Sequence, residues 1–103
     1  MIISNLTGTV TAPSSLEVKN NIKEIERDIE DKLDLLNPVS FIYNEDEENR
    51  LRYGFIYEDM VDIFPNLCFE NSGEKTISYI DLIPLLIKEI QSLKEKIKSL
   101  ENK

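Results

Sequence analysis

A strict seven-residue repeat of apolar side chains near the carboxyl end constrains the fold of this chain more than any other feature. Isoleucine and leucine alternate at steps of three and four, and none of the positions in this repeat is polar. The members are Ile83, Leu86, Ile90, Leu93, Ile97 and Leu100. They occupy the a and d positions of a coiled coil, so the repeat predicts a coiled-coil helix over residues 81–103. The alternative is one amphipathic helix packed on its own domain, which would more often show a wider and less regular stripe.

The positions that flank the repeat bear on the direction and number of helices. Two pairs of opposite charge have the spacing that joins position g of one helix to position e of the next in a parallel assembly. These pairs are Glu89 with Lys94 and Lys96 with Glu101. Isoleucine at a with leucine at d favours two helices. Leu82 at g and Ile87 at e broaden the apolar face, as a third helix requires, so the repeat leaves dimer and trimer open.

Size and charge restrict the partners and the chemistry. A domain of 103 residues buries only about two thirds of its unfolded surface, so association with other chains is favoured. The net charge of −8 repels phosphate backbones and anionic lipids, so we expect no nucleic acid and no membrane partner. With no histidine and a single cysteine, Cys68, the chain has no histidine triad and no Cys/His zinc site. It also has no glycine-rich phosphate loop, so we expect no cofactor and no metal.

Residues 1–13 differ from the rest because they carry no charge and are rich in β-branched side chains. They predict a short strand or an extended lead-in, which we interpret as the end of an upstream fibre. An ordinary disordered terminus is the alternative. The start MIISNLTG lacks the basic region and long apolar core of a signal peptide, and no apolar run reaches the ~20 residues of a membrane span. A soluble protein is therefore expected.

Residues 14–80 predict one mixed domain of helices and strands. Apolar residues three and four apart predict a helix between Ser14 and Asn37, ending before Pro38. This stripe consists of Val18, Ile22, Ile25, Ile29, Leu33 and Leu36. The expected elements after it are an aromatic-rich hairpin (39–43 and 53–57), a short helix (58–64) and a strand (76–79). The predicted fold class is α+β, with the coiled-coil helix at the end.

Two further features of this domain have plain structural interpretations. The acidic run Glu45–Glu48 lies between the two aromatic strands, and we interpret it as a solvent-exposed loop tip rather than a cation site. Cys68 stands in an apolar stretch and is interpreted as a small buried hydrophobe.

The start of the first predicted helix carries two interpretations. Residues 14–17 spell a capping box, in which Ser14 and Glu17 close the first helical turn. A serine nucleophile is the other interpretation, and in a chain without histidine its base would be a lysine amine such as Lys19. Residues five apart on a helix do not share a face, so Ser14 would have to lie outside the helix to meet Lys19. Ser15 is the alternative nucleophile.

These segments together resemble the C-terminal intramolecular chaperone domain of endosialidase-type phage tailspikes, which also occurs in tail fibres and neck appendages. The resemblance covers about residues 14–100. The family is similar in having a serine, a lysine five residues later, and then asparagine and isoleucine. The matching features here are Ser14, Lys19, Asn21 and Ile22, the run Leu36–Phe41, the run Gly54–Leu67, Tyr79, and the run DLIPLLIKEIQSL.

The resemblance implies a fold, an assembly and an activity. The implied fold is an intertwined parallel homotrimer around the C-terminal helices, with residues 14–80 as the chaperone domain. The implied activity is to align three copies of an upstream fibre in the host cytoplasm during virion assembly, and then to cut between Pro13 and Ser14. Ser14 would be the nucleophile and Lys19 the general base. A plain coiled-coil adaptor without protease activity is the alternative function.

The chain departs from the family pattern beside the implied cut. Ser15, Leu16 and Glu17 stand where the family usually has aspartate and arginines. Pro13 has a fixed φ, which restricts how its carbonyl can be presented to a nucleophile.

Overall fold

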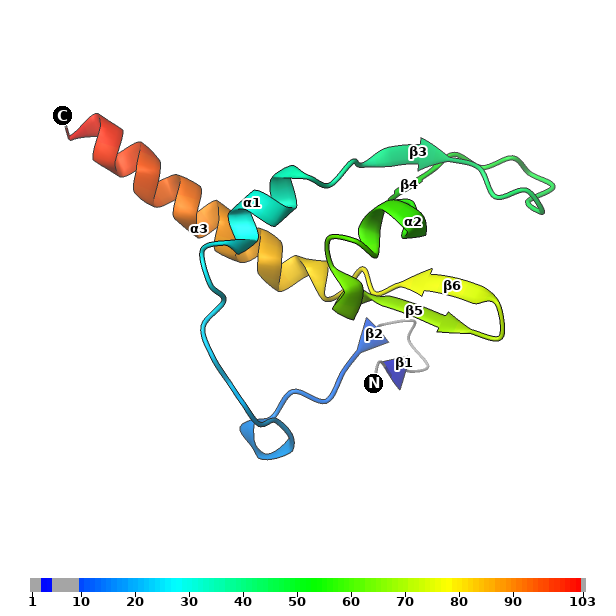
Figure 1. Cartoon of the computed structure of the whole chain (residues 1–103), viewed down its shortest axis with the longest axis horizontal. Coiled ribbons are helices and arrows are strands. Elements are labelled where there is room, and N and C mark those ends of the chain that lie inside the picture. Colours follow the sequence, from blue (N-terminus) through cyan, green and yellow to red (C-terminus); the bar gives the residue numbers. More distant parts are fainter. Residues whose placement is uncertain (1–2, 5–9, 103) are drawn as a thin grey trace.

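The computed structural model describes residues 3–4 and 10–102, which form an α+β fold (Figure 1). A long helix, α3, carries a small body of shorter elements near its start. The elements in chain order are β1 (Ile3–Ser4), β2 (Val10–Thr11), the 3₁₀ helix η1 (Leu16–Val18), α1 (Ile29–Asp34), β3 (Val39–Phe41), β4 (Arg52–Gly54), α2 (Tyr57–Met60), the 3₁₀ helix η2 (Pro65–Leu67), β5 (Cys68–Asn71), β6 (Glu74–Ile77) and α3 (Leu82–Glu101). Within the described residues, the strands pair as three separate antiparallel hairpins, β1–β2, β3–β4 and β5–β6. The predicted α+β class, with a long helix at the carboxyl end, is confirmed.

In the described residues, the secondary structure at both ends of the chain agrees with the prediction from the sequence. The predicted C-terminal helix is confirmed from Leu82 to Glu101, while Lys103 lies outside the described residues. The lead-in forms the short β1–β2 pair, and residues 1–2 and 5–9 of it also lie outside the described part. No helix in the described ranges is long and apolar enough to cross a membrane.

The long helix predicted after Pro13 is wrong for most of its length. The chain makes one 3₁₀ turn in η1, adopts a left-handed backbone at Asn21 (φ 52°) and becomes α-helical only in α1. Ile29 packs against the core, whereas Val18 and Ile22 remain exposed. A short amphipathic helix is stable only where another surface covers its apolar stripe. The core covers the second half of this stripe, from Ile29 onward, and the first half is exposed to solvent. Only the second half is therefore α-helical.

The aromatic hairpin is confirmed, with strands shorter than predicted. Val39 pairs with Gly54 and Phe41 with Arg52 across β3 and β4. Tyr57, which the alternation placed in the second strand, instead begins α2.

Gly54 lets this hairpin contact the start of α3. A Cβ at Gly54 would lie 2.5 Å from the hydroxyl oxygen of Tyr79, which no real contact allows. That hydroxyl accepts a hydrogen bond from the backbone N–H of Phe55 (3.2 Å), and the two rings stack at 6.2 Å between centroids. The absence of a side chain at Gly54 therefore lets Tyr79, three residues before α3, anchor the hairpin.

The third hairpin, β5–β6, turns at Ser72 and Gly73, whose positive φ values of 52° and 85° suit a tight two-residue turn. The strand predicted over 76–79 is present but shifted toward the turn, at Glu74–Ile77. The short helix predicted over 58–64 ends earlier, at Met60, and a further turn leads to Pro65.

The core is small and lies where α1, α2, η2 and the first turn of α3 meet. Its fully buried members are Met60, Phe64, Leu67 and Leu82. Cys68, predicted to be a small buried hydrophobe, packs against this cluster but is only partly buried, and burial raises the pKa of its thiol. So few buried side chains give a single chain of this size little hydrophobic stabilisation.

Candidate functional site

The apolar stripe of α3 is uncovered along the whole helix. All six a and d side chains are exposed, with exposed fractions between 46% and 67%, and Ile87 at position e is exposed beside them. Monomeric soluble proteins rarely expose a contiguous apolar surface of this length, and such a surface marks an interaction site. We call this surface the α3 stripe; it consists of Ile83, Leu86, Ile87, Ile90, Leu93, Ile97 and Leu100.

A different face of α3 packs on the chain's own body. Leu82 is buried to 5% exposure, Leu85 packs against the core, and Ser92 is buried further along the helix. These residues occupy positions g and c of the heptad, beside the a and d positions. One expectation is therefore wrong: Leu82 does not broaden the exposed apolar face, because the core of its own chain covers it. Ile87 alone of the two proposed flanking residues extends the α3 stripe.

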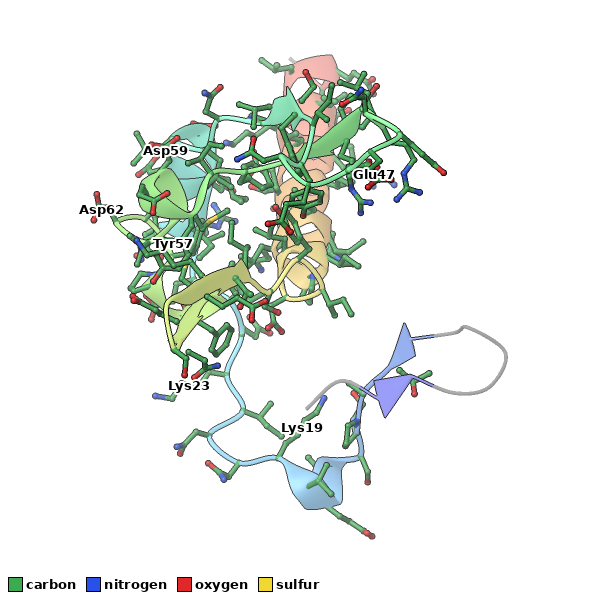
Figure 2. The ribbon with its side chains drawn as sticks, turned by 90° about the vertical axis from the view of Figure 1, so that its right-hand side faces the viewer. Lys19, Lys23, Glu47, Tyr57, Asp59 and Asp62 are labelled. Carbon is green, nitrogen blue, oxygen red and sulfur yellow. The ribbon has the colours of Figure 1, made fainter. Side chains whose placement is uncertain are left out.

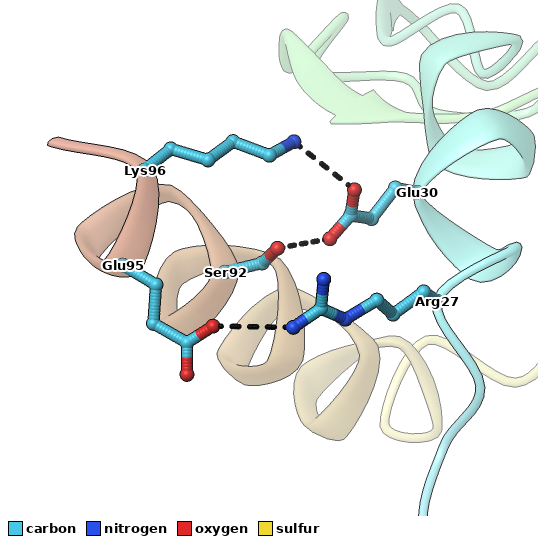
Figure 3. Close-up of polar contacts among 5 residues, drawn as sticks. All are labelled: Arg27, Glu30, Ser92, Glu95 and Lys96. Carbon is cyan, nitrogen blue, oxygen red and sulfur yellow. Dashed lines mark hydrogen bonds and ion pairs between the residues drawn. The ribbon is translucent and has the colours of Figure 1, made fainter. Parts of the chain in front are cut away.

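Polar contacts attach the start of α1 to the middle of α3 (Figure 3). Glu30 accepts a hydrogen bond from the buried hydroxyl of Ser92 and a second from the ammonium of Lys96 at 3.2 Å. Arg27 forms an ion pair with Glu95 at 3.4 Å, which is largely exposed and worth little by itself. We call these five residues the α1–α3 clamp. It fixes residue 27, and with it the end of the segment that carries Ser14, on the face of α3 beside the α3 stripe.

The clamp gives a pH-dependent prediction. The Ser92 hydroxyl first, and then the Lys96 ammonium, hold the pKa of Glu30 below its ordinary 4.5. A lowered folded-state pKa stabilises the fold fully above about pH 4.5, and this stabilisation is lost as the pH falls through the folded-state pKa. We expect Glu30→Gln to lower the melting temperature by a few degrees at pH 7, and the difference from wild type to shrink on acidification. Glu26→Gln, a nearby exposed carboxylate, is the control, and an equal loss in both variants would contradict the clamp.

Ser14 and Lys19 lie together at the other end of this segment. The Lys19 ammonium donates a hydrogen bond to the Ser14 hydroxyl at 2.7 Å. Ser15 caps η1 by accepting from the backbone N–H of Glu17 (3.2 Å), so the capping role falls to Ser15 and not to Ser14. After Val18 the backbone is extended, which removes the helical constraint and lets Lys19 reach back over five residues. Figure 2 shows Lys19 on a segment that lies clear of the body.

This pair has the contact that a serine–lysine dyad needs, in an exposed setting. A general base must accept the hydroxyl proton, which requires a neutral amine. Burial disfavours the charged form of an amine, and the separate chain leaves this segment in solvent. The catalytic roles of Ser14 and Lys19, and the cut after Pro13, stay predictions.

The acidic loop between the aromatic strands makes its own contacts. Asp46 accepts hydrogen bonds from the backbone N–H groups of Arg50 and Glu48, and these contacts lower the pKa of its carboxyl. Its carboxylate is thus engaged in shaping the loop. Across residues 3–4 and 10–102, no group of three or more acidic or cysteine side chains is placed to hold a metal ion.

Comparison with known families identifies the domain. A family model described as chaperone of endosialidase matches residues 14–68, more than half of the chain. The chain belongs to the chaperone of endosialidase family. No curated protein matches it. The family match begins at Ser14, includes Lys19, and ends in β5, so the α3 stripe lies beyond it.

Membership in the chaperone of endosialidase family supports an intramolecular chaperone role for this chain. The clamp was not foreseen from the sequence. Glu30 belongs to a run of exposed-looking charges, and Ser92 and Lys96 lie outside the a and d pattern. The one signal in the sequence is that Ser92 and Lys96 stand four residues apart, on one face of α3.

Proposed function

We propose that this domain assembles as a parallel homotrimer that brings three copies of an upstream fibre of the same polypeptide into register. The fibre would be a phage tail fibre, tailspike or neck appendage, and assembly would take place in the host cytoplasm. The chaperone family supports the role. The uncovered α3 stripe is the single observation that carries the proposal, because it has the length and period of a coiled-coil seam.

Two further observations support association through α3. The same chain covers Leu82 at g and Leu85 and Ser92 at c, so the a, d and e positions are free for neighbouring copies. One carboxylate oxygen of Glu89 is buried without a hydrogen-bond partner in the described part of the chain. Such an orphaned group costs free energy, and the parallel register brings Lys94 of a neighbouring copy toward this position. Ile87 favours three helices over two, since it widens the apolar face.

The chaperone role predicts a large effect on the fibre. Joining residues 1–103 behind a β-rich trimeric fibre is expected to raise the yield of soluble, heat-resistant trimer, because alignment of the three chains removes most of the entropic cost of starting the fibre. Yield and heat resistance are measured with and without residues 14–103. An unchanged yield after this deletion would show that the domain is not a chaperone for that fibre.

The second part of the proposal is self-cleavage at Pro13–Ser14. The Ser14 hydroxyl oxygen would attack the carbonyl carbon of Pro13 while Lys19 accepts the hydroxyl proton. The bond from that carbon to the Ser14 nitrogen breaks, the nitrogen takes the proton, and the resulting ester is hydrolysed by water. The 2.7 Å contact between the two side chains supports this assignment. The second candidate function is a coiled-coil adaptor that keeps the stripe and lacks this chemistry.

A further inference from the structure

An aromatic groove lies between the two larger hairpins. It has a volume of about 560 Å³, and its apolar walls are Phe41, Tyr43, Phe55, Tyr57, Ile77 and Tyr79. Glu58, Glu74 and Lys75 also line the groove; Glu58 forms an ion pair with Lys75 at 3.1 Å, while Glu74 has no ion-pair partner within the described residues. The groove therefore offers apolar and aromatic surface together with a free negative charge.

A second feature of the chain has the matching chemistry. Every described side chain from residue 11 to residue 24 is exposed, and we call residues 12–26 the arm. Leu16, Val18 and Ile22 are 60% to 75% exposed, which is unusual for three large apolar side chains so close together. The arm holds two lysines and three glutamates, a net charge of −1, and Lys23 has no ion-pair partner in the part of the chain described.

The arm of a chain does not lie on the groove of the same chain. In Figure 1 the arm leaves α1, loops below the body to η1 and turns back toward β2, while the β3–β4 and β5–β6 hairpins that form the groove extend to the right. Figure 2 likewise shows Lys19 clear of the body that carries Tyr57. The groove is therefore open to a segment that comes from another chain.

The groove is placed where a neighbouring copy would come close. Tyr79 lines it and stands four residues before Ile83, the first residue of the α3 stripe. Neighbouring helix axes in a bundle are about 10 Å apart. An extended chain covers about 3.4 Å per residue, so the arm from its anchor at residue 27 has ample length to cross to the next copy.

We propose that the arm of one chain docks in the aromatic groove of a neighbouring copy, with Leu16, Val18 and Ile22 against the aromatic walls and Lys23 facing Glu74. This inference rests on the proposed trimer and names the partner of its Ser14–Lys19 segment. Docking covers the apolar side chains that the separate chain leaves exposed. It also removes Ser14 and Lys19 from bulk water only after assembly, which couples the proposed cut to a completed trimer.

Disulfide trapping tests the docking. In a Cys68→Ala background, which has no other thiol, Val18→Cys is combined with Ile56→Cys in the groove lining. Under mild oxidation we expect covalent dimers and trimers on a non-reducing gel, at about tenfold higher yield than for a control pair, because docking raises the local concentration of the two thiols. The control combines Val18→Cys with Tyr53→Cys, an exposed site of the same hairpin outside the groove.

Charge exchange provides the second test. Lys23→Glu and Glu74→Lys are each expected to reduce the cross-linked fraction several-fold, and the double variant to restore it. A trimeric mass with equal yields for the groove and control pairs overturns the docking and leaves the trimer intact. Internally linked monomers show that the arm binds its own chain, which also overturns the inference. A monomeric mass overturns the trimer and the docking together.

Discussion

Replacing Ile90 with aspartate is expected to convert the assembled protein into monomers. Ile90 occupies the central a position of the α3 stripe and is half exposed in the single chain, so assembly must bury it. Burying an isoleucine contributes on the order of 1.5 to 3 kcal/mol per chain. The variant loses this contribution in every copy and places carboxylates together near the axis, where an unpaired buried charge costs about 3 to 5 kcal/mol.

The measurement is sedimentation equilibrium at micromolar concentration, with circular dichroism to show that the fold of the body persists. Gln91→Asp is the matched control, because residue 91 is exposed at position b and outside the stripe. We expect Gln91→Asp to keep the wild-type mass. An Ile90→Asp protein that also keeps it would show that the stripe is not the interface.

Ser14→Ala is expected to abolish the cut in a chain extended upstream of residue 1. Removing a serine nucleophile ordinarily lowers the rate by at least about 10³-fold, and the loss of its base has a similar effect. We therefore expect Lys19→Ala to abolish the cut as well. Ser15→Ala removes only the cap of η1, so it is the matched control and should still be cut.

The assembled trimer is incubated, and the amino terminus of any fragment is sequenced. The dyad predicts a new terminus at Ser14. A terminus at Ser15, or a cut that survives Lys19→Ala, would contradict the assignment. No cut in the wild-type trimer would show a chaperone without protease activity, a result consistent with the fixed φ of Pro13 and with Leu16 and Glu17 at positions where the family usually has other residues.

The elements predicted correctly are those whose signals are local. The heptads predicted α3, because an apolar period of seven is set by the residues of the helix itself. The prediction of one helix between Ser14 and Asn37 was wrong because the apolar period indicates only that one face of the segment is apolar. A segment with such a face forms a helix only where other residues cover the face. In this chain the core covers the apolar face of α1 and leaves Val18 and Ile22 exposed.

The candidate sites also differ in whether a local pattern in the sequence predicts them. The a and d residues were read directly from their period, and their exposure in the single chain agrees with a role between chains. Ser14 and Lys19 were selected by spacing and resemblance, and their contact depends on an extended backbone after Val18 that the helical pattern did not predict. The partnership of Glu30 with Ser92 spans 62 positions, and no local pattern in the sequence encodes it.

In the proposed trimer, two other copies of the same chain cover the α3 stripe. The most direct test is the mass of the wild-type protein in solution, measured by sedimentation equilibrium at micromolar concentration without any upstream fibre. We expect three times the chain mass of 12.0 kDa. A monomeric mass would contradict association through the stripe, and a stable dimer would contradict the trimer and favour a coiled-coil adaptor.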